Sequence, residues 1–175
     1  MAERKIAALL QETPAFDYVN PENKAFVVAF DDAMEACGYS AGGAIGNGYC
    51  WGHHMLIYSK VGVKSKKVTA RIYLQENGIV LRLFFSGIDK HRAKLEAIPE
   101  HIKSVFLKGF GDCNHCHNEK DGACQFRKSY TLHNVLIEKC NGNTFWFRNP
   151  SLSLLPDYLA LYDMFYPLRE SGGQK

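Results

Sequence analysis

The sequence predicts an α+β fold, with an antiparallel sheet that carries helices mainly on one face. Three observations lead to this prediction. Helical and strand-like patterns alternate in the order helix, strands, helix, strands, helix. Two apolar runs flank Asn77-Gly78, a pair typical of tight hairpins. The cysteine-rich stretch 111–126 shows neither pattern and is expected to be irregular.

Length and composition are those of a globular protein. The 175 residues suffice for one domain over 1–170 with a flexible tail at 171–175, and a hydrophobic share of 46% argues against disorder. A net charge of +3 is too small to require nucleic acid or an anionic membrane as partner. The first ten residues resemble neither a signal peptide nor a spanning helix, so a cytoplasmic protein without membrane contact is expected.

The first third of the chain contains two predicted helices. One covers 3–11 and ends before Thr13-Pro14. The other covers 21–37, because Asn20-Pro21 is a helix start signal and Gly38 stands where a C-terminal glycine is expected. A glycine-rich loop over 40–48 follows this helix.

The middle of the chain is predicted to form strands. Residues 49–58 are expected to be one strand, and 59–67 a lysine-rich loop. With Asn77-Gly78 as type I′ turn residues, 68–74 would pair with 79–85, and Leu74 would face Leu81. Because side chains alternate along a strand, one face of that hairpin would be apolar. The opposite face would carry Arg71, Tyr73, Arg82 and Phe84.

Helices and strands alternate again in the last half. Asp89 would cap a helix over 90–97, and Pro99-Glu100 would start another that ends near Leu107. We expect strands at 129–139 and 143–148 around a turn at Asn141-Gly142. A closing helix is predicted over 154–165.

Four cysteines have spacing suited to one tetrahedral zinc ion. Two residues lie between Cys113 and Cys116, seven between Cys116 and Cys124, and fifteen between Cys124 and Cys140. Four thiolates leave no open position on the ion, so the site would be structural and would produce a zinc-stapled irregular segment. His117 could replace one cysteine as ligand, and redox-active thiols, an iron–sulfur cluster or unrelated cysteines are the alternatives.

A second group of residues suggests a ligand surface. The glycine-rich run from Gly46 to Gly52 would let backbone approach a ligand closely. Aromatic rings and arginines near it could bind a carboxylate, a phosphate or a stacked ring. The candidate ligand-binding residues are Trp51, His53, His54, Tyr58, Arg71, Tyr73 and Arg82. The leading interpretation is a small-molecule or peptide-binding module with a structural zinc site.

Other interpretations compete with this one. The arginines could simply decorate the solvated face of an antiparallel sheet. An enzyme could use Cys50 as nucleophile with His53 or His54 as base, although no local motif supports catalysis. The lysines between Lys60 and Lys67 could contact protein or nucleic acid, but a solvated loop is favoured.

The stretches GNGYCWGHHMLIY, KVTARIYLQENGIVLRLFF, CNHCHNEKDGACQFRKSY and EKCNGNTFWF resemble small single-domain bacterial proteins of uncharacterised function. The resemblance covers roughly residues 45–165. It implies a compact α+β domain in the cytoplasm and carries no activity and no catalytic residues.

Overall fold

The computed structural model describes residues 5–64, 66–109, 127–140 and 144–167. These residues divide into two compact units. The first unit comprises the chain up to Leu83 and from Trp146 onward, and the second comprises Phe84–Phe145. The α+β class is confirmed, because the structure combines an antiparallel sheet with α-helices.

The first unit contains most of the large sheet and three α-helices. The helices are α1 Ile6–Glu12, α2 Pro21–Ala36 and α6 Leu155–Phe165. Three short 3-10 helices accompany them, η1 Pro14–Phe16, η2 Tyr49–Trp51 and η4 Leu152–Leu154. The strands of the sheet are β1 Tyr39–Ser40, β2 Gly46–Asn47, β3 His54–Lys60, β4 Val68–Gln75, β5 Gly78–Phe84 and β8 Thr144–Arg148. Their order is β1-β3-β4-β5-β8, and β2 pairs with β3.

Helix α2 forms where its sequence signals predict. The side-chain oxygen of Asn20 accepts a hydrogen bond of 2.8 Å from the Asn23 amide, and Pro21 occupies the first turn. After Cys37, Gly38 takes a positive φ of 79° that disfavours other residues. The predicted helix 21–37 is therefore confirmed to within one residue.

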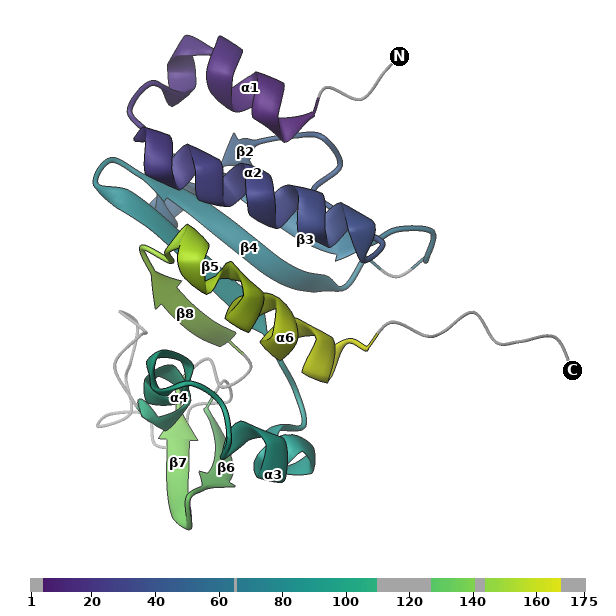
Figure 1. Ribbon diagram of the computed structural model, residues 1–175, viewed down its shortest axis with the longest axis vertical. Helices are drawn as coiled ribbons and strands as arrows, with labels where there is room; N and C mark the ends of the chain where they lie inside the picture. The colour runs from purple at the N-terminus through teal and green to yellow at the C-terminus, as the bar shows by residue number, and fades with distance from the viewer. Residues whose placement is uncertain (1–4, 65, 110–126, 141–143, 168–175) are drawn as a thin grey trace, which may run out of the picture. The chain divides into compact units, whose positions relative to one another are not determined.

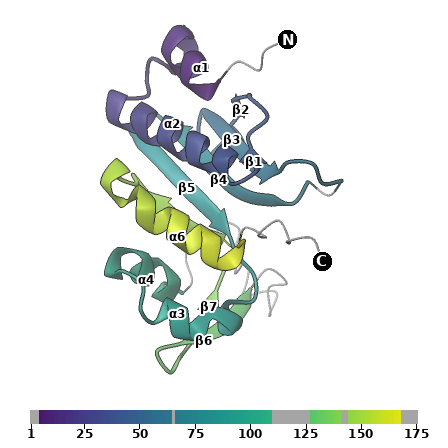
Figure 2. The ribbon, with the colours of Figure 1, turned by 45° about the vertical axis from the view of Figure 1, so that its right-hand side comes forward.

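Helices α2 and α6 lie along one face of the sheet (Figures 1 and 2). Aromatic contacts connect the two layers. Phe30 of α2 meets Tyr58 of β3 at a centroid distance of 5.3 Å, and Tyr158 of α6 meets Phe147 of β8 at 5.1 Å. The strand residues that are fully buried on this face are Leu56, Tyr58, Ala70, Ile72, Leu74, Ile79, Leu81 and Leu83.

The predicted β4–β5 hairpin exists, but its predicted register is wrong. Gln75 pairs with Gly78, so Glu76 and Asn77 form the turn instead of Asn77-Gly78. Leu74 consequently pairs with Ile79 rather than with Leu81. Because the pairing shifts by two residues, every side chain stays on its predicted face.

Contact with Asn149, the residue that directly follows β8, explains the use of Gly78. The Asn149 side-chain oxygen accepts a hydrogen bond from the Ile79 amide, and the Asn149 amide donates to the Ile79 carbonyl. A Cβ atom on Gly78 would overlap that side-chain oxygen. The glycine is therefore needed for close approach of Asn149 and not for a type I′ turn.

Substitution of this glycine should destabilise the protein. We expect Gly78→Ala to lower the free energy of unfolding by about 2 kcal/mol, because the new methyl group overlaps Asn149 and strains the backbone. Urea unfolding of both proteins measures the effect. Gly46→Ala is the matched control, since a Cβ there meets nothing closer than 3.9 Å. Equal stability of Gly78→Ala and the parent protein would contradict the contact.

The segment 40–58 differs from its prediction. Within the expected loop, β1 and β2 form short antiparallel pairs with β3. The expected strand 49–58 begins only at His54, because Tyr49–Trp51 turns into η2. Tyr49 has a positive φ of 52°, which is incompatible with extended strand geometry.

The second unit contains a short helical region and a hairpin. Its elements are η3 Ile88–His91, α3 Arg92–Leu95, α4 Glu100–Leu107, β6 Lys128–Leu132 and β7 Val135–Lys139. A single strand over 129–139 was the wrong prediction. The chain turns at His133 and Asn134, which both have positive φ, and β6 pairs with β7.

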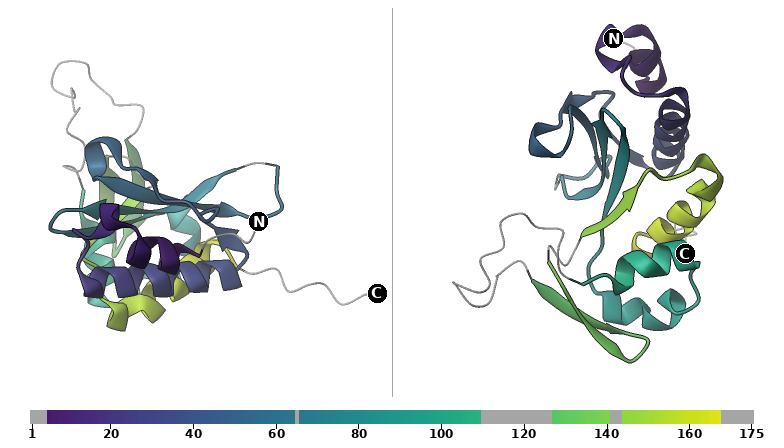
Figure 3. Two further views of the ribbon diagram at one scale, coloured as in Figure 1. Left: turned by 90° about the horizontal axis from the view of Figure 1, so that it is seen from above. Right: turned by 90° about the vertical axis from the view of Figure 1, so that its left-hand side faces the viewer.

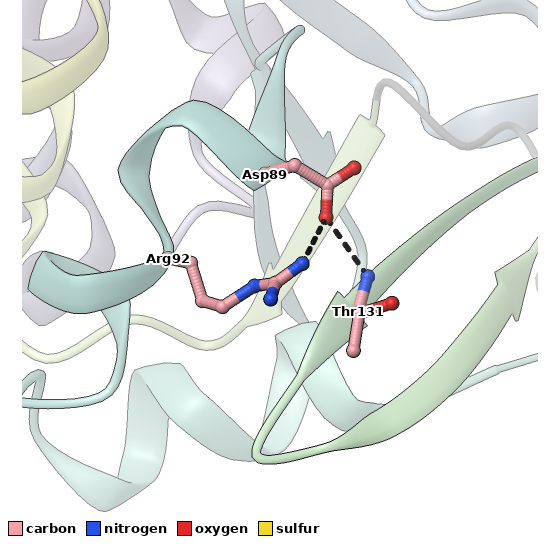
Figure 4. Close-up of polar contacts among 3 residues, drawn as sticks. All are labelled: Asp89, Arg92 and Thr131. Atoms are coloured by element: carbon pink, nitrogen blue, oxygen red, sulfur yellow. Dashed lines mark hydrogen bonds and ion pairs between the residues drawn. The ribbon is translucent and has the colours of Figure 1, made fainter.

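Asp89 connects η3 with this hairpin. Its Oδ1 atom accepts hydrogen bonds from the Thr131 amide at 3.0 Å and from Arg92 Nη2 at 3.2 Å (Figure 4). These two donors hold the pKa of the Asp89 carboxyl below its usual range. Nearby, Phe106 of α4 stacks on Phe145 at a centroid distance of 4.1 Å, and the Tyr130 hydroxyl donates to the Phe106 carbonyl.

Candidate functional site

The sheet face opposite α2 and α6 carries a group of arginine and aromatic side chains. In β4 and β5 the buried apolar residues of the helix-covered face alternate with Arg71, Tyr73 and Arg82, which therefore lie on the opposite face. Arg71 and Arg82 are direct cross-strand partners. Together with Trp51 and Trp146, they form what we call the arginine–tryptophan cluster: Trp51, Arg71, Tyr73, Arg82 and Trp146.

Tyr73 is the polar centre of the cluster. Its hydroxyl oxygen accepts hydrogen bonds from Arg71 Nη1 at 3.3 Å and from Arg82 Nη1 at 3.2 Å. Two guanidinium groups thus converge on one neutral oxygen. The arrangement holds both side chains in defined positions, because planar guanidinium groups have a fixed donor geometry.

The two tryptophans enclose Arg82. Its guanidinium carbon lies 4.4 Å from the Trp146 ring centroid and 5.7 Å from that of Trp51. The two indole rings are 4.9 Å apart, and Tyr73 stacks on Trp146 at 5.8 Å with an interplanar angle of 13°. Tyr73 is fully buried and Arg82 is 8% exposed, whereas Trp51, Arg71 and Trp146 are half-buried. The half-buried members are the ones that a ligand can contact.

Close backbone packing positions Trp51. The segment between β2 and β3 lies on the side of the sheet away from α2 and α6 (right-hand view of Figure 3). A Cβ on Gly48 would overlap Gly52, and a Cβ on Gly52 would overlap the Leu74 carbonyl of β4. Gln75 Nε2 then donates a hydrogen bond of 2.8 Å to the Trp51 carbonyl. The glycine-rich run therefore serves to bring the η2 turn onto the sheet.

Three predicted ligand-binding residues lie apart from this cluster. His54 pairs with Leu74 and contacts Phe16 at a ring distance of 4.9 Å, so it belongs to the helix-covered face. Tyr58 is fully buried against Phe30 on the same face. The exposed His53 ring contacts Tyr18 at 5.1 Å. The structure brings together Trp51, Arg71, Tyr73 and Arg82 only.

Sequence reasoning missed Trp146. The signal was present, because Trp146 alternates with the apolar Phe145 and Phe147 in β8. If Phe145 and Phe147 face a core, Trp146 must point to the other face of the sheet. Its position beside β5 could not be foreseen, because β5 and β8 are distant in sequence.

His54 forms a local pair with Tyr18. The Tyr18 hydroxyl and His54 Nδ1 are 2.8 Å apart. Burial, together with the neighbouring His53, lowers the pKa of His54, and burial raises the pKa of Tyr18 to about 12. A neutral imidazole and a protonated phenol suit a hydrogen bond from the hydroxyl to Nδ1, which ties the η1 segment to β3.

Cys50 does not form a nucleophile–base pair in the described part of the chain. Its thiol is exposed at η2, and no hydrogen bond joins it to His53 or His54 among the described residues. The Nδ1 atom of His54 is already engaged by Tyr18. Nucleophilic catalysis requires hydrogen-bond reach between the thiol and its base.

Most of the predicted zinc site lies outside the described residues, namely Cys113, Cys116, Cys124 and the alternative ligand His117. Cys140 is described: it follows β7, is 5% exposed and has a free thiol. Within residues 5–64, 66–109, 127–140 and 144–167, no group of three histidine, cysteine or acidic side chains is arranged to hold a metal.

The lysine-rich loop is exposed. Lys60, Lys64, Lys66 and Lys67 all have exposed side chains, and Lys67 Nζ lies 5.6 Å from the Tyr166 ring centroid. The described helices include none that is long and apolar enough to cross a membrane.

Comparisons with known proteins give no match to this chain. No family model matches it, and neither the curated proteins nor the solved structures contain a significant match.

Proposed function

We propose that the chain is a binding module for a small molecule or peptide, and that the arginine–tryptophan cluster is its ligand surface. The observation that carries the proposal is the convergence of Arg71 and Arg82 on the single hydroxyl of Tyr73. Recognition is strongest when polar groups are already held in place before the ligand arrives.

The placement of the arginines supports a role beyond stability. Like charges directly opposite each other on a sheet repel, so the side chains of Arg71 and Arg82 need contacts that hold them in this arrangement. Tyr73, Trp51 and Trp146 supply hydrogen bonds and cation–π contacts of this kind. Strong positive charge held rigidly beside aromatic rings is a common feature of sites for ligands.

Intrinsic tryptophan fluorescence tests the proposal directly. The chain has two tryptophans, and both belong to the cluster. Titration with a panel of small carboxylates, nucleoside monophosphates and short acidic peptides should produce a saturable fluorescence change with at least one of them. Trp51→Ala should weaken binding of that compound about tenfold or more. Absence of any saturable change across the panel would refute the proposal.

Tyr49→Ala provides the matched control for Trp51→Ala. Tyr49 lies in the same η2 turn but is 76% exposed and belongs to no described ring contact. We expect its removal to leave affinity within about twofold of the parent protein. Equal loss in both variants would show that the turn, and not the cluster, determines binding.

We further propose that Cys113, Cys116, Cys124 and Cys140 hold one structural zinc ion, in a reducing cytoplasmic setting. The spacing of the cysteines supports the proposal, as does the buried free thiol of Cys140 at the end of β7. A structural ion is consistent with a binding module, because it stabilises a chain segment without offering an open coordination position.

A further inference from the structure

The loop between β3 and β4 combines positive charge with exposed apolar side chains. We call it the lysine–valine loop and define it by Lys60, Val61, Val63, Lys64, Lys66 and Lys67. We propose that this loop docks on an anionic lipid surface, where the lysines contact headgroups and the valines enter the interface between headgroups and acyl chains. The inference goes beyond the proposed function, because it involves no residue of the arginine–tryptophan cluster.

The lysine–valine loop extends away from the rest of the first unit. It projects past the end of α2 (Figures 1 and 2). Gly62 at its turn has a positive φ of 74°, and a Cβ atom there would meet nothing within 4 Å. At the base of the turn, the Val61 amide donates a hydrogen bond of 2.9 Å to the Gly38 carbonyl. The tip is therefore open to a partner, while its base is attached to the fold.

The two valines indicate a partner that has an apolar layer. Val61 is 61% exposed and Val63 is 44% exposed, and they lie on either side of Gly62. One exposed apolar side chain is ordinary on a protein surface. Two of them at the turn of a projecting loop form an apolar tip that solvation alone does not require. Transfer of these side chains from water into a lipid interface is favourable.

The local charge favours an anionic partner. No aspartate or glutamate occurs in the sequence between Glu35 and Glu76, whereas the loop has four lysines. All four are exposed, and none forms an ion pair with another described residue. Clustered lysines are attracted to anionic lipids within about one Debye length of the surface. The net charge of +3 for the whole chain predicted no membrane contact, because it does not show this local concentration.

The combination of side chains selects a lipid surface over nucleic acid. Phosphate groups of either partner can contact lysines. Single-stranded nucleic acid is bound in addition by aromatic side chains that stack on its bases, and duplexes are read by polar side chains in a groove. Exposed valines serve neither purpose. A bilayer has anionic headgroups directly above an apolar layer, which matches an apolar tip flanked by lysines.

Vesicle co-sedimentation tests the proposal with the full chain. The two vesicle types are pure phosphatidylcholine, and phosphatidylcholine with about 30% phosphatidylserine. We expect the anionic vesicles to bind at least about tenfold more tightly than the neutral ones, and we expect added salt to weaken this binding. Absence of binding to the anionic vesicles, or equal binding to both types, would overturn the proposal.

Lysine variants test the contribution of charge. Lys64→Gln/Lys66→Gln should weaken binding to the anionic vesicles about tenfold or more. Lys90→Gln/Lys94→Gln is the matched control, because it removes the same charge from exposed positions in the second unit. It should change the affinity by less than about twofold. Equal weakening by the two double variants would overturn the proposal, because binding would then follow net charge.

Valine variants test the contribution of the apolar tip. Val61→Ser/Val63→Ser leaves the charge unchanged and should weaken binding to the anionic vesicles about fivefold or more. Val135→Ser is the control: this valine is 53% exposed in the second unit, and its replacement should have less than about a twofold effect. Circular dichroism of each variant verifies its fold. Unchanged binding by Val61→Ser/Val63→Ser would overturn the lipid assignment, because charge alone would then account for it.

A single-stranded thymidine oligonucleotide tests the competing partner. We expect it to bind more weakly than the anionic vesicles at the same salt concentration. Tighter binding of the oligonucleotide, lost in Lys64→Gln/Lys66→Gln and kept in Val61→Ser/Val63→Ser, would assign the lysine–valine loop to nucleic acid and overturn the lipid proposal.

Discussion

Removal of zinc from the protein is expected to lower its free energy of unfolding by several kcal/mol, with ~5 kcal/mol as a reasonable scale for a structural site. The ion would connect Cys113, Cys116 and Cys124 with Cys140, which directly follows β7. Chelation should therefore destabilise the β6–β7 hairpin first. Metal analysis of protein purified without added zinc should find about one ion per chain, and a melt before and after chelation measures the loss.

Cysteine variants give this prediction its controls. Cys116→Ser should reduce both metal content and thermal stability, because a hydroxyl is a much poorer zinc ligand than a thiolate. Cys37→Ala should leave metal content unchanged, since Cys37 caps α2 in the first unit and is not in the four-cysteine set. Protein that contains no zinc, or whose melting does not respond to chelation, would contradict the structural site.

Replacement of Asp31 by asparagine is expected to stabilise the protein at neutral pH by about 1–2 kcal/mol. Asp31 lies on α2, is 5% exposed, and its Oδ1 atom has no hydrogen-bond partner in the described chain. The Tyr58 hydroxyl of β3 adjoins the carboxyl and acts on it as a donor, although no contact between them has full hydrogen-bond geometry among the described residues. Burial raises the pKa of Asp31 to about 6; the Tyr58 hydroxyl opposes this shift, and the charges of Glu35 and Asp32 add to it.

The pH dependence follows from the direction of this shift. The folded protein holds the Asp31 proton more tightly than the unfolded chain, whose pKa is near 3.8. The stabilising contribution of the protonated carboxyl is therefore complete below about pH 3.8 and is lost as the pH rises through about 6. Asp31→Asn has no such proton to lose, so its advantage over the parent protein should grow between those pH values.

Urea unfolding at a series of pH values between 4 and 8 measures the effect. Asp32→Asn is the matched control, because Asp32 is the adjacent acid of α2 and is exposed. We expect it to change stability by less than about 0.5 kcal/mol. A lower stability of Asp31→Asn at pH 7.5 would show that the ionised carboxyl is favourably bound in the fold.

Residues close in sequence determined the parts of the fold that were predicted well. Asn20 and the proline after it define the start of α2, and Gly38 defines its end. Each of these residues acts on backbone only a few positions away. The alternation in β4 and β5 likewise assigned Arg71, Tyr73 and Arg82 to one face before any pairing was known. Such features depend on local sterics and on strand periodicity.

Contacts between distant segments determined what the sequence misassigned. The hairpin register depends on Asn149, whose contact with Gly78 and Ile79 comes from the far end of the chain. The sequence suggests grouping His54 and Tyr58 with the arginines because both lie in the same stretch as Trp51, yet β3 places both on the helix-covered face. Proximity along the chain is a poor guide to proximity across a sheet.

For the candidate site, the sequence by itself determined the types of side chain and the strand face on which Arg71, Tyr73 and Arg82 lie. Only the tertiary structure decided that Trp51 and Trp146 enclose Arg82. The close packing of Gly48 and Gly52 positions Trp51 in the cluster, and the pairing of β8 with β5 positions Trp146 there. Both positions depend on burial and hydrogen bonding between segments that are distant in sequence. A local sequence pattern does not report the free energy of such contacts.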